Sequence, residues 1–193
     1  MGVRLIMNDL IYLKHLAFDK SIYDACKFVL EDDRFAEWSG SGSPENHHYG
    51  DGGLLQHTAE VVRLCEMTLK TLPCKANPRI LFTAAIWHDY GKIWDYQKNG
   101  DVWSKSNNHA RTIHHISRGA MEYHAAWGAD TEFDNAVIHC ILSHHGRREW
   151  GSPVAPLSEE AWILHLCDSL SARVNDCHKV DRLKVKGDSR SYT

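Results

Sequence analysis

Apolar residues recur along most of the chain at the three- to four-residue spacing of an α-helix, and no stretch alternates with the two-residue period of a strand. Residues 54–72 form one such segment, preceded by a glycine-containing breaker at residues 50–53. A second helix is predicted to begin at Asn77-Pro78, because Asn caps a helix and Pro suits its first position. Residues 93–108 are polar and break the pattern, so an irregular segment is expected there. The pattern predicts an all-α fold in the form of a single helical bundle.

Three more helices are predicted in the second half of the chain, and one near its start. One covers residues 109–127. The next begins at Thr131 and Asp134, which have the spacing of a capping box. The last covers residues 159–177. Asp19 can cap a helix in the N-terminal region. No internal repeat and no second domain are apparent.

Composition narrows the functional classes without choosing one. The 193 residues carry a formal net charge of −3, so a broad basic surface for nucleic acid is not expected. No apolar run approaches the ~20 residues that span a bilayer, and the first residues do not resemble a secretory signal. The six cysteines include no C-x-x-C pair and are interpreted as free thiols. We therefore expect a cytoplasmic protein with no membrane partner.

Fourteen histidines make a metal site worth considering, because histidine is the commonest side-chain metal ligand. Several metal-competent side chains lie on or beside apolar stripes of separate predicted helices. They are His57, His88, Asp89, His144 and Asp168. A buried, unpaired carboxylate is very costly, and coordination of a metal offsets that cost. Helical bundles build metal sites from such convergent side chains.

Each residue also has a simpler interpretation. A single histidine on an apolar face is more often a hydrogen-bonded core residue than a ligand. Asp89 alone could cap the end of a helix, and Asp168 could pair with Arg173 or Arg111. The simpler interpretation weakens because it must hold at every position at once.

The histidines and aspartates follow one another along the chain in an order that resembles the ligand set of the HD superfamily. The series is His57, His88-Asp89, His115, His144-His145 and Asp168. The superfamily is named after an adjacent His-Asp pair, which is followed here by Tyr-Gly-Lys. The closer resemblance is to the HD domain of YhaM-like 3′→5′ exoribonucleases, and it covers residues 8 to 178 approximately. The stretches that carry it are NHHYGDGGLLQHT (46–58), AAIWHDYGKI (84–93), HHISRGA (114–120), LSHHGRREWGSP (142–153) and EEAWILHLCDSLSARV (159–174).

The resemblance implies a set of metal ligands. Those of a first ion would be His57, His88, Asp89 and Asp168, and His115 and His144 would complete a second site. His145 is an alternative to His144, because the motif contains both. The mixed nitrogen and oxygen ligands suit one or two Mn²⁺, Fe²⁺, Co²⁺, Ni²⁺ or Zn²⁺ ions better than Mg²⁺.

Other residues of the motifs are candidates for substrate binding. Lys92 would contact a substrate phosphate, and both Lys92 and Asp89 are expected to be catalytic. Arg147, Arg148 and Trp150 offer cations and a stacking surface for a base, although a solvated turn is an equal alternative. His47 and His48 match the motif and could line the entrance.

The resemblance also implies a reaction and a domain plan. We expect a metal-dependent phosphohydrolase that uses metal-activated water on a nucleotide, a short oligonucleotide or a nucleic-acid 3′ end. Residues 1–45 would form an N-terminal helical extension and flexible link, residues 46–178 the HD domain, and residues 179–193 a loosely ordered tail. The family's exoribonucleases carry an RNA-binding OB-type domain, which the 193 residues are not expected to accommodate, so we do not expect processive action on long RNA.

Two other classes fit the same ligands. Mixed-valent di-iron oxygenases of the HD superfamily use equivalent His and Asp residues to oxidise carbon. A non-catalytic nucleotide-binding sensor could also keep the fold. The sequence leaves the oligomeric state open.

Overall fold

The computed structural model describes residues 2–16, 19–106, 108–129 and 131–177. The α-helices of the first half are α1 (Gly2–Leu16), α2 (Lys20–Leu30), α3 (Asp33–Glu37), α4 (Gly53–Thr71), α5 (Pro78–Trp87) and α6 (Lys92–Asp95). Two strands follow, β1 (Tyr96–Asn99) and β2 (Val102–Lys105). The second half contains α7 (His109–Thr112), α8 (His115–Ala126), α9 (Glu132–Ser143), a 3-10 turn η1 (Arg148–Trp150) and α10 (Glu159–Cys177).

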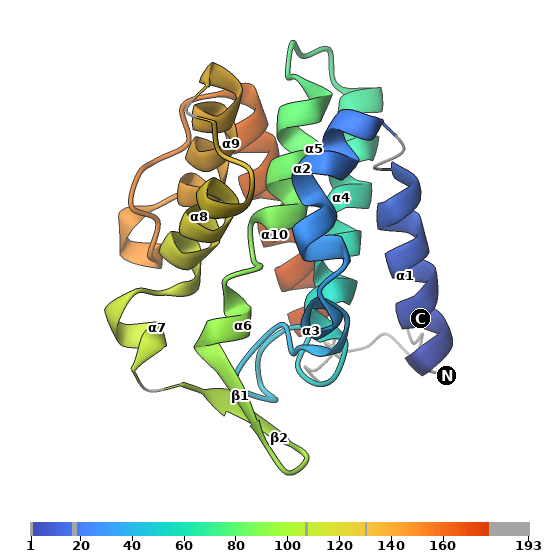
Figure 1. Ribbon diagram of the computed structural model, residues 1–193, viewed down its shortest axis with the longest axis vertical. Helices are drawn as coiled ribbons and strands as arrows, with labels where there is room; N and C mark the ends of the chain where they lie inside the picture. Colours follow the sequence, from blue (N-terminus) through green and yellow to red (C-terminus); the bar gives the residue numbers. More distant parts are fainter. Residues whose placement is uncertain (1, 17–18, 107, 130, 178–193) are drawn as a thin grey trace, which may run out of the picture.

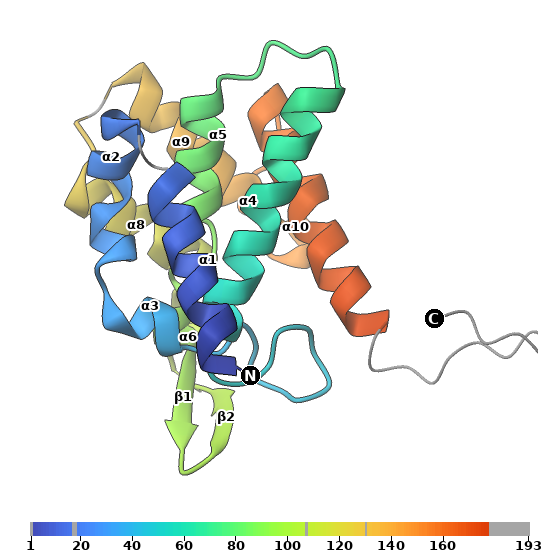
Figure 2. The same cartoon turned by 90° about the vertical axis from the view of Figure 1, so that its right-hand side faces the viewer.

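Helices α4, α5 and α10 form the centre of a bundle (Figure 1), with α1 and α2 on one side and α8 and α9 on the other. Figure 2 shows α10 along one edge, with α4 between it and α1. The all-α prediction is confirmed, with one local correction. The segment predicted to be irregular contains a short antiparallel hairpin, in which Tyr96 pairs with Lys105 and Asn99 with Val102.

Helix α5 is largely buried, and part of the candidate site follows its C-terminal end. Its residues from Leu81 to Trp87 are all buried. The helix begins as predicted, with the Asn77 side chain accepting a hydrogen bond from the amide of Arg79. Trp87 donates its indole N–H to the main-chain oxygen of Ala25 in α2 at 2.9 Å. These contacts fix the position of the two residues that follow the helix.

The helix predicted over residues 109–127 is divided in two. His114 lies between α7 and α8 with φ of 69°, a left-handed conformation that interrupts helical hydrogen bonding. Helix α8 therefore begins at His115, and that residue is buried. Helix α9 begins at the predicted capping box of Thr131 and Asp134.

The N-terminal helices pack against the bundle. Tyr12 of α1 donates a hydrogen bond to Glu66 of α4 at 3.0 Å. In the segment predicted to be a flexible link, Ser39 and Ser41 are buried, and Ser39 accepts a hydrogen bond from the amide of Gly50. The division of the chain at residue 45 stays a prediction, and the predicted tail at 179–193 lies outside the described residues.

Candidate metal centre

Six predicted ligands from five segments meet inside the bundle, and each is at most 8% exposed. His57 lies in the first turns of α4, and Asp168 lies in the middle of α10. His88 and Asp89 follow α5, His115 begins α8 and His144 follows α9. Because helix ends and a helix face supply them, a small cavity can receive side chains from several directions.

Four of these residues form a first cluster, His57, His88, Asp89 and Asp168. His57 Nε2 lies 3.0 Å from Asp168 Oδ1 and 3.3 Å from Asp89 Oδ2. His88 Nε2 lies 3.3 Å from His57 Nε2 and 3.4 Å from Asp89 Oδ2. It also lies 3.9 Å from Asp168 Oδ1. The four side chains thus turn one ligand atom each toward a common point.

Asp89 connects this cluster to a second group of side chains. Its other oxygen, Oδ1, lies 3.6 Å from His115 Nε2 and 3.7 Å from His144 Nε2. These three atoms are buried and make no hydrogen bond. One carboxylate therefore divides its two oxygens between two pairs of imidazoles.

Hydrogen bonds on the outer side of each ring determine which nitrogen faces the centre. His88 Nδ1 lies 2.7 Å from the main-chain oxygen of Ala85, and His144 Nδ1 lies 2.7 Å from that of Ile141. A carbonyl oxygen can only accept, so both Nδ1 atoms carry the proton. The Nε2 lone pairs of His88 and His144 are therefore available at the centre.

The other two rings are oriented by side chains that the sequence did not single out. His57 Nδ1 lies 3.1 Å from Ser171 Oγ, and Ser171 donates its own proton to Glu60 at 2.8 Å. His115 Nδ1 lies 3.0 Å from Asp95 Oδ2. Outer partners of this kind are usual for metal-binding histidines.

The charges of the centre are balanced by strong shifts of pKa. Burial alone would lower the pKa of His57, but hydrogen bonds to Asp168 and Asp89 outweigh it and raise the pKa to about 9. Burial would raise the pKa of Asp89, whereas Lys92 and the neighbouring imidazoles hold it well below its usual value. The pKa of Asp168 is lowered against its burial mainly by His57. Without a metal, both carboxylates are charged and His57 is protonated.

These residues fit one or two divalent transition-metal ions. Ligand atoms 2.0–2.1 Å from a common ion lie roughly 3.0–3.4 Å apart, close to the spacings in the first cluster. Asp89 Oδ1, His115 Nε2 and His144 Nε2 are buried acceptors or lone pairs without a donor. Such atoms are costly to bury unless a cation satisfies them.

Lys92 is buried against Asp89 and does not reach far into solvent. Its Nζ lies 2.6 Å from Asp89 Oδ2, and the residue is 5% exposed. Burial would lower the pKa of this amine, but the charge of Asp89 outweighs burial and raises it. Lys92 therefore offers a fixed positive charge at the wall of the site.

Two hollows open beside the centre and share part of their walls. The first hollow, about 260 Å³, contacts Asp168 and Trp150. The second hollow, about 340 Å³, contacts His115, Tyr96 and Lys105. Their shared wall consists of His47, Lys92, His145 and Arg173.

The predicted substrate-binding loop enters these hollows only in part. Trp150 lines the first hollow, and the Arg147 guanidinium lies 4.8 Å from the centre of its ring. Neither Arg147 nor Arg148 belongs to the walls of the two hollows. Lys105 and Arg173 are cations there instead. Lys105 gave no signal in the sequence because it lies on a strand that the hydrophobic pattern did not predict.

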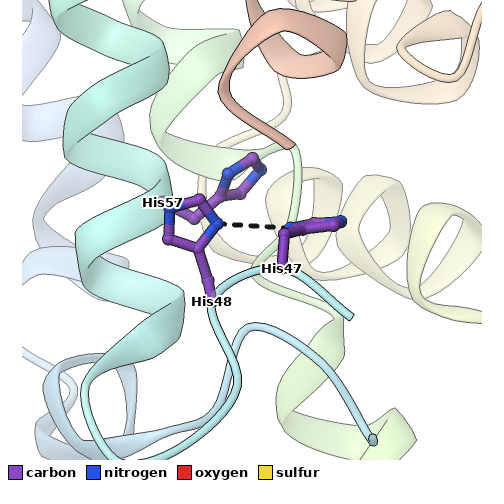
Figure 3. Close-up of side chains that lie close together, drawn as sticks. All are labelled: His47, His48 and His57. Carbon is purple, nitrogen blue, oxygen red and sulfur yellow. Dashed lines mark hydrogen bonds between the residues drawn. The ribbon is translucent and has the colours of Figure 1, made fainter. Parts of the chain in front are cut away.

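His47 and His48 lie beside His57 (Figure 3), with the Nδ1 atoms of His47 and His48 3.3 Å apart. His48 is buried and bonds Glu60 through Nε2 at 2.8 Å, while His47 faces both hollows. Of the adjacent pair 144–145, His144 faces Asp89. His145 has its Nδ1 on the main-chain oxygen of Trp150 at 2.7 Å and lines the hollows.

The chain belongs to the HD-domain family, whose model matches residues 54–173. That stretch is more than half of the chain and includes all six residues of the centre. The resemblance found in the sequence is thereby confirmed. In the described part of the chain, no helix has the length and apolar character needed to cross a membrane.

Curated relatives agree with this assignment. The chain is 30% identical over 153 residues to the 3′-5′ exoribonuclease YhaM of Shouchella clausii (strain KSM-K16). This alignment covers 77% of the chain and 47% of that relative. The chain is 34% identical over 134 residues to YhaM of Bacillus pumilus (strain SAFR-032), and 33% over 135 residues to YhaM of Bacillus subtilis (strain 168). Each of these two alignments covers 68% of this chain and 42% of the relative. The chain thus spans less than half the length of these relatives. Comparison with solved structures gave no significant match.

Proposed function

We propose that this chain is a metal-dependent phosphohydrolase that cleaves a phosphodiester in a short oligonucleotide or at a nucleic-acid 3′ end. The observation that carries the proposal is the division of the Asp89 carboxylate between two pairs of buried imidazoles. His57 and His88 lie on the Oδ2 side, and His115 and His144 lie on the Oδ1 side. This arrangement suits two ions that share one bridging carboxylate.

The first ion would be held by His57, His88, Asp89 and Asp168, and the second by Asp89, His115 and His144. The mixed ligand set suits Mn²⁺, Fe²⁺, Co²⁺, Ni²⁺ or Zn²⁺. Such ions, when bound, lower the pKa of water and polarise phosphoryl oxygens.

The protein's own residues would position the substrate and balance its charge. Lys92 holds a positive charge beside Asp89, where it offsets the negative charge of a bound phosphate. Arg173, also on the shared wall, adds a second cation. Trp150 offers its ring to a base in the first hollow. Because Lys92 is buried, bulk water screens its charge little.

The two hollows favour a diester over a monoester. One contacts Asp168 of the first cluster and the other contacts His115 of the second, and Lys92 lies in the wall between them. At about 260 and 340 Å³, each hollow offers room for a small organic group. A phosphate at the shared wall would therefore carry one nucleoside into each hollow. The relatives are named as 3′-5′ exoribonucleases, which agrees with such a substrate.

The test is hydrolysis by the Mn²⁺-loaded protein in the absence of oxygen. We expect dinucleotides and short oligonucleotides to be cleaved faster than mononucleotides, with products resolved by chromatography. Cyclic nucleotides belong in the same screen. Binding of nucleotides without turnover would support the sensor, and oxygen consumption by the iron-loaded protein with no hydrolysis would support the oxygenase. The cytoplasmic setting and the domain division stay predictions.

A further inference from the structure

Asp95 is not one of the six predicted ligands, but it is bonded to one of them, His115. It ends α6, and its side chain is 3% exposed. Its Oδ2 accepts hydrogen bonds from both the main-chain N–H and Nδ1 of His115, each at 3.0 Å. Its Oδ1 lies 2.7 Å from His109 Nδ1. The carboxylate therefore connects α6 to the start of α8 and to α7.

These bonds fix both the tautomer and the orientation of His115. An ionised carboxylate can only accept, so the proton of the His115 ring lies on Nδ1. The lone pair on Nε2 then faces Asp89 Oδ1 at 3.6 Å. The second bond, to the main-chain N–H, fixes the carboxylate relative to the backbone of the same residue. Asp95 thus determines both which nitrogen faces the centre and where that nitrogen lies.

His115 differs in this respect from the other histidine of the second site, His144. His144 is oriented by the main-chain oxygen of Ile141, which no side-chain substitution removes. The orientation of His115 depends on a side chain. The side-chain partners of Asp95 are His109 and His115, and neither belongs to the first cluster.

We propose that Asp95 is a positioning residue that decides whether the centre holds one ion or two. This inference rests on the proposed two-ion function. Without Asp95, the His115 ring can rotate or carry its proton on Nε2, and the second site then lacks a ligand. The first cluster keeps its four ligands and their contacts.

The test is metal stoichiometry and affinity, measured by titration calorimetry with Mn²⁺ and by elemental analysis after dialysis. The wild type is expected to bind two ions. Asp95→Ala is expected to keep the first ion and to lose affinity for the second by about 10- to 100-fold, as for other outer-shell partners of metal-binding histidines. Asp95→Asn should lose less, because an amide oxygen can still accept from Nδ1. The magnetic coupling of two Mn²⁺ ions in the electron paramagnetic resonance spectrum should disappear in Asp95→Ala.

Asp134→Ala is the matched control. Asp134 is also a buried carboxylate, accepting hydrogen bonds from Tyr123 and Thr131, but it caps α9 away from the centre. Its variant is expected to lose stability and still bind both ions. If Asp95→Ala and Asp95→Asn bind two ions with wild-type affinities, the role of Asp95 is overturned. Loss of both ions in Asp95→Asn, with its helices intact, also overturns it. A wild type that binds a single ion contradicts the two-ion centre itself, and the role of Asp95 with it.

Discussion

Asp89 is the residue on which the proposed chemistry depends most, because its two carboxylate oxygens face two different pairs of imidazoles. Asp89→Asn keeps the size of the side chain but replaces one oxygen with an NH₂ group, which offers no lone pair to an ion. We expect phosphodiester hydrolysis to fall by roughly 10²- to 10³-fold, the scale of losing one central electrostatic group. Turnover of a dinucleotide measures this loss, and circular dichroism checks that the helices remain.

The adjacent histidines supply a comparison for that variant. His144 faces Asp89, whereas His145 lines the hollows with its Nδ1 bonded to the main chain. His144→Ala should therefore impair hydrolysis more than His145→Ala does. Near-normal hydrolysis by Asp89→Asn would rule out the mechanism proposed above.

His57 makes metal binding depend on pH. Its pKa of about 9 means that, below that pH, the ion-free protein holds a proton on this ring. An ion needs the lone pair on Nε2 and must displace that proton, so affinity rises as pH rises. We expect the dissociation constant of the first ion to fall by roughly tenfold per pH unit between about pH 7 and 9, and to level off above that range. Calorimetry in buffers of different ionisation enthalpy measures the proton released, and an affinity that is flat over this range would contradict the assignment.

At the scale of elements, the docking of α8 onto the segment after α5 depends on Gly91. A Cβ atom at this position would lie 2.0 Å from the main-chain oxygen of His115. Because that oxygen belongs to the backbone, the clash cannot be relieved by a side-chain rotation. Gly91→Ala should therefore push the start of α8 away and destabilise the fold by about 1–3 kcal/mol. Thermal unfolding measures this change, and Mn²⁺ stoichiometry should show weaker binding at the second site.

Gly119 in α8 is the control for this substitution. A Cβ atom added there would lie 3.4 Å from its nearest neighbour, the main-chain oxygen of Trp87, which is ordinary contact. Because Ala is the better helix former, Gly119→Ala should be neutral or stabilising by up to about 1 kcal/mol. Equal destabilisation by the two substitutions would show that the close approach at Gly91 is not the cause.

Local signals predicted most of the helices and much of the centre. The cap at Asn77 and the capping box at Thr131 lie at the helix starts that the structure shows. The break at His114 was missed, because a left-handed conformation at a residue other than glycine leaves little trace in a hydrophobic pattern. The hairpin at 96–105 was missed because its strands are short and largely exposed.

The side chains that orient His57 and His115 could not be predicted from the sequence for a different reason. Glu60 and Ser171 are bonded although 111 residues separate them, and Asp95 contacts His115 from 20 residues away. No local pattern specifies such pairs. The motif identified the six residues that converge, and only the tertiary structure brought in Asp95, Glu60 and Ser171 around them.

For the molecule as a whole, we expect metal binding at the centre to stabilise the folded state. Its candidate ligands come from or beside α4, α5, α8, α9 and α10, so an ion that binds the native state alone stabilises all their contacts. An ion at about 100 times its dissociation constant adds about 2.7 kcal/mol, which corresponds to a change in Tm of about 5–10 °C for a chain of this size. A chelator should lower Tm by that amount, and added Mn²⁺ should restore it. An unchanged Tm in protein shown to be free of metal would argue against ligands drawn from several helices.

The distance along the chain between the ligands also has a consequence in time. His57 and Asp168 face each other at 3.0 Å, yet 111 residues separate them. At about 5–20 residues per second, a ribosome needs roughly 6–22 seconds to pass from one to the other. Throughout that interval the growing chain has the first ligand of the centre without the last. A nascent or truncated chain that ends before α10 therefore lacks one of the four ligands of the first cluster. In the proposed function, hydrolysis begins only after α10 has joined the bundle.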